Sequence, residues 1–228
     1  MKIELVVCDL AGTTIKDNRD VHKALQRAFA AFGISITLDE ANEVMGLPKP
    51  VAIRQLLVMK GRARKATESF IARVHEEFMC EMIWFYENDK EFSEKEGVSD
   101  TFQKLKQNGI KIVVDTGFDR KITNAILRRT GWLGNGLIDA SVSSDEVAQG
   151  RPYPDLIFKA MKLTGVEKAE AVVKVGDTKS DLIEGTSAGC GMVIGITTGA
   201  FSKEILQQEK HSHLISQIPE LVPILGLA

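Results

Sequence analysis

Short runs of apolar, mostly β-branched residues recur along the chain, and each run ends in small or polar turn residues. They cover residues 3–7, 109–114, 171–175 and 191–197. Runs of this length without polar alternation are typical of strands that are buried on both faces of a sheet. Helical patterns separate the later runs, at residues 99–107, 121–129, 155–163 and 180–187. The alternation predicts an α/β fold, a Rossmann-like, doubly wound parallel sheet with helices on both faces.

Residues 16–96 interrupt this alternation, because they contain no strand-like run and read as helices throughout. Asn18 is expected to cap a helix that runs to residue 32 and stops at Gly33, and Pro50 suits the first turn of a helix that ends near Gly61. We therefore expect two domains, an α/β core of residues 1–15 plus 97–228 and an inserted α-helical cap of residues 16–96. Such a cap would close over the strand ends.

The longest helical pattern, at residues 66–86, carries one apolar face. Its apolar residues are spaced by three or four: Phe70, Val74, Phe78, Met82 and Phe85. This stripe is interpreted as core or as a dimer face, so a homodimer through the cap is allowed by the pattern.

Composition limits the classes of partner. The 228 residues carry a net charge of −2, which gives no reason to expect nucleic acid or an anionic membrane as a partner. No apolar run is long enough to span a bilayer and no signal-peptide pattern is present, so the expected location is the cytoplasm. The three cysteines lie far apart, and His211 and His213 are interpreted as solvated residues of a polar tail rather than metal ligands.

Polar residues follow three of the predicted strands, at the edge where ligands bind in such sheets. Asp9 alone would be explained as a turn cap. It is accompanied by Thr116 with Gly117, by Arg151 in a Gly-Arg-Pro loop, and by Asp177 with Asp181. Together these residues supply a carboxylate nucleophile, donors and a cation for phosphate oxygens, and a pair of acids for a metal.

These segments resemble, in order, the four motifs of the haloacid dehalogenase superfamily of phosphotransferases. The matching segments are residues 9–14, residues 113–117, Arg151 and residues 176–181. The resemblance covers residues 2 to about 199, and the inserted helices are similar to the cap of members with an α-helical lid.

The resemblance implies a role for each matched residue. Asp9 would attack phosphorus and form an aspartyl-phosphate. Mg²⁺ would be bound by the ligand set Asp9, the carbonyl of Ala11, Asp177 and Asp181. The phosphoryl group would be bound by Thr116, Gly117 and Arg151. The substrate would be a small phosphorylated or phosphonate metabolite.

Ala11 departs from the usual pattern, in which a second Asp protonates the leaving alcohol. The phosphonoacetaldehyde hydrolase branch also reads Asp-x-Ala-Gly-Thr-Thr, and there a cap lysine in a Met-Gly-x-x-Lys segment forms a Schiff base with the substrate. Lys49 occupies that place in this sequence. Ala52 and Phe118 stand where the branch typically has His and Tyr, and Arg19 stands near the place of a Cys.

Several alternatives remain open at this point. Lys49 alone is also explained as a solvated residue before a helix that begins with Pro. A phosphomonoesterase that tolerates Ala11 would keep the fold without imine chemistry, and a ligand-binding regulator would bind Mg²⁺ and phosphate without turnover. A dinucleotide binder is disfavoured, since the glycine cluster at residues 131–136 does not join a strand to a helix.

Overall fold

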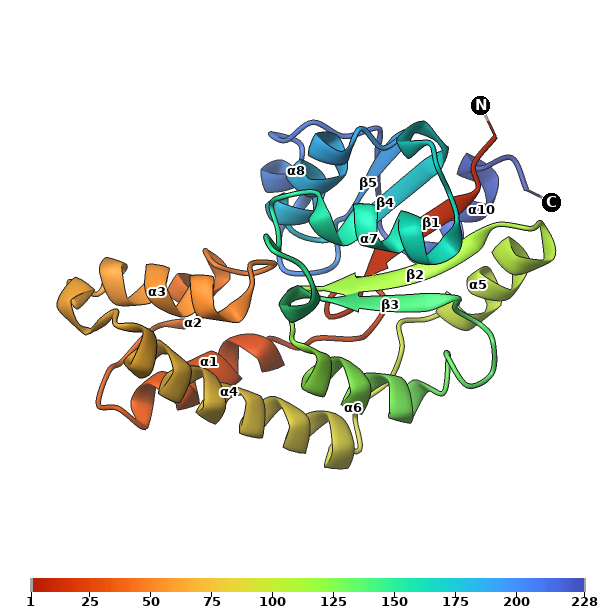
Figure 1. Cartoon of the computed structure of the whole chain (residues 1–228). Helices are drawn as coiled ribbons and strands as arrows, with labels where there is room; N and C mark the ends of the chain where they lie inside the picture. The colour runs from red at the N-terminus through yellow and green to blue at the C-terminus, as the bar shows by residue number, and fades with distance from the viewer. Residues whose placement is uncertain (1, 228) are drawn as a thin grey trace.

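A computed structural model describes residues 2–227, and its centre is one six-stranded sheet in which every neighbouring pair of strands is parallel (Figure 1). The strand order is β3-β2-β1-β4-β5-β6. The strands are β1 (Leu5–Asp9), β2 (Lys111–Thr116), β3 (Ala140–Ser143), β4 (Val172–Gly176), β5 (Met192–Ile196) and β6 (His213–Ile215). The predicted Rossmann-like α/β fold is confirmed.

Both faces of the sheet are covered, as the unbroken apolar runs predict. In β1, Val6 and Cys8 belong to one apolar cluster, whereas Leu5 and Val7 belong to another. The first cluster includes residues of α5 (Val98–Gln107) and α6 (Arg120–Thr130), and the second includes residues of α7 (Asp155–Thr164). A further helix, α8 (Lys179–Ala188), follows β4 and packs on β4 and β5. Alternate side chains of one strand therefore serve two cores.

Helices fill the segment between β1 and α5. They are α1 (Asp20–Ala30), α2 (Leu38–Asn42), α3 (Lys49–Met59) and α4 (Glu68–Asn88). Figure 1 shows them as a group beside the edge where β1 and β2 end. The two connections to the sheet run side by side, because Lys16 N donates to Ser93 O and Lys95 N donates to Thr14 O. No helix within residues 2–227 has the length and apolar character that crossing a membrane requires.

The start of α1 corrects one prediction. Asn18 does not cap the helix; instead Asp17 Oδ1 accepts hydrogen bonds from Asp20 N at 2.6 Å and Val21 N at 3.3 Å. The intervening Arg19 has a φ of 62°, in the left-handed region. This turn brings Asp17 back over the first amides of the helix, which have no intrahelical partner. The helix ends at Ala30, two residues before the expected end.

Two short edge strands were not expected from the sequence. β3 has four residues and β6 has three, too few to show a hydrophobic period. His213 therefore begins a strand rather than lying in a tail, and its side chain is exposed. In α4, Val74, Phe78 and Met82 are buried as predicted. The ends of the buried stripe are Ile71 and Tyr86 rather than Phe70 and Phe85.

Candidate active site

A narrow pocket, partly open to solvent, lies between the sheet and the inserted helices. Its walls come from both parts of the chain. The sheet and its loops contribute Asp9, Ala11, Thr116, Gly117, Phe118, Arg151, Asp177, Thr178 and Ala200. The inserted segment contributes Asp17, Val21, Met45, Gly46 and Lys49. The structure thus brings together every residue proposed for the site except Asp181, which is fully buried beside Arg151.

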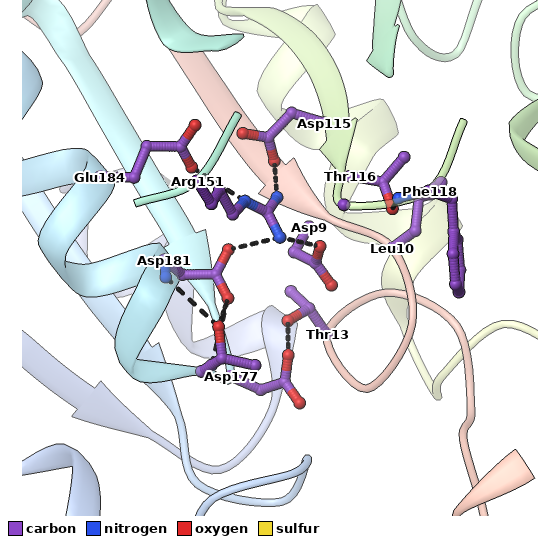
Figure 2. Close-up of polar contacts among 12 residues, drawn as sticks. Asp9, Leu10, Thr13, Asp115, Thr116, Phe118, Arg151, Asp177, Asp181 and Glu184 are labelled. Atoms are coloured by element: carbon purple, nitrogen blue, oxygen red, sulfur yellow. Dashed lines mark hydrogen bonds and ion pairs between the residues drawn. The ribbon is translucent and has the colours of Figure 1, made fainter. Parts of the chain in front are cut away.

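Arg151 is the centre of the charged network behind the pocket (Figure 2). Its Nη1 donates to Asp9 Oδ1 at 2.6 Å, its Nη2 to Asp115 Oδ1 at 2.6 Å, and its Nε to Glu184 Oε2 at 3.0 Å. All four side chains are buried. A guanidinium held on three sides by carboxylates has one orientation, so the network fixes the cation beside the end of β1.

Lys174 completes this network from within β4. The side chain is 0% exposed, and its Nζ donates to both oxygens of Asp115 at 2.5 and 2.6 Å and lies 3.0 Å from Glu184 Oε2. Burial alone would raise the pKa of Asp115, but Arg151 and Lys174 outweigh burial and lower it. Burial and the charge of Asp115 raise the pKa of Glu184 to about 8. The motifs in the sequence do not point to these supporting residues, although a lysine within an apolar strand is a signal of a buried charge.

Asp177 at the end of β4 is held with its carboxylate facing the loop after β1. Its Oδ1 accepts from Thr13 Oγ1 at 2.9 Å, and its Oδ2 accepts from Ala200 N at 2.6 Å. A Cβ on Gly12 or Gly199 would lie 2.2 or 2.1 Å from Asp177 Oδ2, so both glycines are needed for this packing. The segment of residues 9–14 thus carries the Asp9 carboxylate and also supports the next acid, Asp177.

The acids at this edge form a site that fits a divalent cation. Burial raises the pKa of Asp9 to about 8; Arg151 opposes this, while Asp181 and Asp177 add to it. Burial and the charge of Asp181 raise the pKa of Asp177 to about 6. Asp181 Oδ1 is buried without a hydrogen bond, although Arg151 and Lys174 lie at ion-pair distance. Clustered carboxylate oxygens that repel one another are typical of sites for hard cations.

One triad of acids, Asp9, Asp115 and Asp181, offers oxygens within 4.8 Å of one another. Asp115, however, is already neutralised by Arg151 and Lys174. The other two acids of this triad, Asp9 and Asp181, could hold a cation together with Asp177, whose charge adds to the raised pKa of Asp9.

Lys49 lies in the first turn of α3 and is only 3% exposed. Its Nζ is 3.4 Å from Leu47 O and sits over the rings of Phe118 and Phe78, 5.1 and 5.7 Å from their centroids. Within residues 2–227, no carboxylate lies at ion-pair distance from this amine. Burial lowers its pKa to about 8; the charge of Asp9 works against this and that of Arg151 adds to it. The interpretation of Lys49 as a solvated residue is therefore wrong.

Thr116, the last residue of β2, also lines the pocket. Thr116 Oγ1 accepts from Phe118 N at 3.1 Å, which leaves its hydroxyl hydrogen free to donate into the pocket. Burial lowers the pKa values of His22 and His75, and the positive charge of Lys49 lowers both of them further. In the part of the chain that the structure describes, neither imidazole lines the pocket. Two imidazoles thus lie near Lys49 although position 52 is Ala.

Comparisons with known proteins agree with this geometry. The profile of the haloacid dehalogenase-like hydrolase family matches residues 6–196. A phosphonoacetaldehyde hydrolase of Bacillus thuringiensis is 32% identical over 230 residues, which cover 96% of this chain and 86% of the relative. Another, from Bacteroides fragilis, is 32% identical and covers 92% and 82% of the two chains.

Solved structures show the same fold. A phosphonoacetaldehyde hydrolase-like protein from Oleispira antarctica superposes with a TM-score of 0.88 at 23% identity, covering 99% of this chain and 92% of that one. The family profile spans most of the chain, and the curated relatives are matched over nearly their whole length. This protein therefore belongs to the haloacid dehalogenase-like hydrolases.

Proposed function

We propose that this protein is a Mg²⁺-dependent hydrolase that cleaves the carbon–phosphorus bond of a small aldehyde phosphonate, as its phosphonoacetaldehyde hydrolase relatives are named to do. One observation carries the proposal. A buried lysine with a lowered pKa, Lys49, shares a pocket with the carboxylate of Asp9, and Ala11 provides no acid between them. An amine of this kind is partly neutral near physiological pH and can attack a carbonyl.

The core side of the pocket binds the phosphoryl group. Asp9 attacks phosphorus, while the Thr116 hydroxyl, the Gly117 amide and Arg151 bind the oxygens on which negative charge increases. Asp9, the carbonyl of Ala11, Asp177 and Asp181 would hold Mg²⁺. When bound, it offsets the repulsion between the Asp9 carboxylate and an anionic substrate. The result is an aspartyl-phosphate on Asp9, which water then hydrolyses.

The cap side of the pocket provides for the leaving group. Lys49 condenses with the aldehyde to form a protonated imine. As the Asp9 oxygen bonds to phosphorus, the carbon–phosphorus bond breaks and its electron pair moves toward the imine nitrogen, giving an enamine. A carbanion stabilised in this way needs no acidic side chain at position 11. An alkoxide leaving group, in contrast, needs an acid there to protonate it.

The first experiment measures release of phosphate and acetaldehyde from phosphonoacetaldehyde with Mg²⁺, beside a panel of small phosphomonoesters. We expect turnover of the phosphonate, loss of activity in Asp9→Asn and after chelation of the metal, and a reducible adduct on Lys49. Turnover of phosphomonoesters alone, independent of Lys49, would instead establish the second candidate, a phosphomonoesterase without Schiff-base chemistry. Binding of Mg²⁺ and phosphate without any turnover would indicate a regulator.

We further propose that residues 16–96 act as a cap that opens and closes about the paired connections at Ile15 and Glu94. The loop before α3 contacts the core through glycines. A Cβ on Gly117 would lie 2.8 Å from Leu47 O, and a Cβ on Gly150 would lie 2.5 Å from Pro48 Cγ. The closed arrangement therefore requires small residues on the core side of this contact.

Gly150→Ala tests this closure. Gly150 has no positive φ, so Ala fits its backbone, but the new methyl group meets the rigid ring of Pro48. We expect kcat/KM to fall about 10²-fold because Lys49 is displaced from Asp9. The free energy of unfolding in urea should change by less than about 1 kcal/mol, since the cap can rest open. Gly134→Ala, where the nearest atom would be 3.7 Å away, is the matched control. Unchanged kcat/KM in Gly150→Ala would contradict this view of closure.

A further inference from the structure

Imine formation requires proton transfers inside the pocket, and neither His22 nor His75 lines it. The neutral Lys49 amine adds to the carbonyl carbon, its nitrogen loses a proton and the carbonyl oxygen gains one, giving a carbinolamine. A second proton must reach the hydroxyl group so that water leaves as the carbon–nitrogen double bond forms. The balance is aldehyde plus amine plus one proton giving protonated imine plus water. An acid at the cap side of the pocket is therefore needed.

Asp17 is a carboxylate in that place. It lies in the first connection between sheet and cap, and its side chain lines the pocket together with Lys49. Its Oδ1 accepts the two hydrogen bonds from the start of α1. Among residues 2–227, no hydrogen bond to Oδ2 is found, so this oxygen is available to a bound molecule. The N-terminus of α1 thus holds one oxygen in place and leaves the other for chemistry.

The two ends of the pocket differ in charge, and Asp17 lies at the end that would hold the aldehyde. A phosphonate belongs beside Thr116, Gly117 and Arg151, where a second uncompensated carboxylate would repel it. Asp17 comes from the same inserted segment as Lys49, and its charge raises the pKa of that amine. It therefore faces the neutral, carbonyl part of the substrate.

The surroundings also suit an acid. Burial raises the pKa of Asp17, and the charge of His22 partly opposes this. The titratable or charged groups that interact with it come from every element packed around it: His22 and Asp20 of α1, Lys49 of α3, Tyr86 of α4, and Lys95 of the second connection.

We propose that Asp17 is the proton-transfer residue of imine formation: it donates a proton to the departing hydroxyl of the Lys49 carbinolamine and takes it back when the imine is hydrolysed. This rests on the proposed function and gives the chain a proton donor on the cap side of the pocket, where position 52 is Ala. The chain thus carries its imine-forming acid just before α1 rather than on α3.

The test measures the rate of reductive trapping of phosphonoacetaldehyde on Lys49 by cyanoborohydride, between pH 5 and 10, with mass spectrometry to locate the adduct. Asp17→Asn is the informative variant, because its amide oxygen can still accept the two α1 hydrogen bonds but cannot exchange a proton. Asp20→Asn is the matched control at the same helix start, outside the pocket. Binding of inorganic phosphate, measured in parallel, reports on the integrity of the core site.

In the wild type, trapping should rise with pH as Lys49 loses its proton, near pH 8. We expect Asp17→Asn to trap about 10²-fold more slowly at every pH in this range, with phosphate binding unchanged. An unchanged rate and pH profile in Asp17→Asn, with a wild-type adduct on Lys49, overturns this inference alone. No adduct on wild-type Lys49 overturns the proposed function and this inference with it.

Discussion

Replacing Lys49 with Met is expected to abolish carbon–phosphorus cleavage and, at the same time, to stabilise the protein. Loss of the imine nucleophile should lower kcat/KM by roughly 10⁴-fold or more. The stabilisation follows because burial lowers the pKa of Lys49 from 10.5 to about 8. Burying the charged amine therefore reduces the free energy of unfolding. Removing that penalty should raise the free energy of unfolding by roughly 3 kcal/mol at pH 7.

The difference in stability between Lys49→Met and the wild type should also depend on pH. The folded-state pKa lies below the unfolded value, so the penalty is fully present below pH 8 and declines as the pH rises from about 8 to 10.5. The difference in stability between Lys49→Met and the wild type should therefore shrink in urea unfolding at pH 10. Lys60→Met is the control, because Lys60 is partly exposed and its Nζ pairs with Glu40 at 2.9 Å. A Lys49→Met protein that cleaves the phosphonate normally, or that is less stable than the wild type, would contradict the assignment.

Ala11→Asp is expected to convert the enzyme toward phosphomonoester hydrolysis. Ala11 lines the pocket two residues after Asp9, in a tight loop closed by the hydrogen bond from Gly12 N to Ile15 O at 2.8 Å. A carboxylic acid there would protonate an alcohol as it leaves phosphorus, which is typically worth about 10² to 10⁴ in rate. We expect phosphomonoester turnover to rise by at least about 10²-fold.

The panel of substrates used for the wild type measures this gain. Ala11→Asn has nearly the same size but carries no acidic proton, so it should show no increase. The double variant with Asp9→Asn should be inactive on all substrates, because both reactions use the same nucleophile. If Ala11→Asp gains nothing, another group already serves as the acid for phosphomonoesters, and Ala11 does not select the leaving group.

Much of the site followed from local pattern. An apolar run that ends at Asp9 must be a buried strand with its acid at the carboxyl edge, and parallel strands bring Thr116 and Asp177 to the same edge. These positions depend on the spacing of hydrophobic residues and on turn residues, both of which can be read directly from the sequence. The short strands β3 and β6 could not be found in this way, because three or four residues show no period.

The electrostatic environments of Lys49 and Arg151 could not be predicted from the sequence. Whether Lys49 is a solvated residue or a buried amine depends on Phe118 and Phe78, which come from distant segments. The same is true of Arg151, whose orientation is set by Asp115 and Glu184 on two other elements. A pKa responds to everything within several ångströms, and neighbours of that kind are assembled only by folding.

The sequence by itself determined the parallel α/β sheet, the inserted helices and the edge on which the acids gather, because hydrophobic period and turn chemistry are local properties. Only the tertiary structure decided that Lys49 is buried without a carboxylate partner, that Lys174 and Glu184 belong to the network around Arg151, and that Asp17 rather than Asn18 accepts hydrogen bonds from the first amides of α1. These features arise where segments far apart in the chain enclose a shared space, so burial and charge there belong to the fold as a whole.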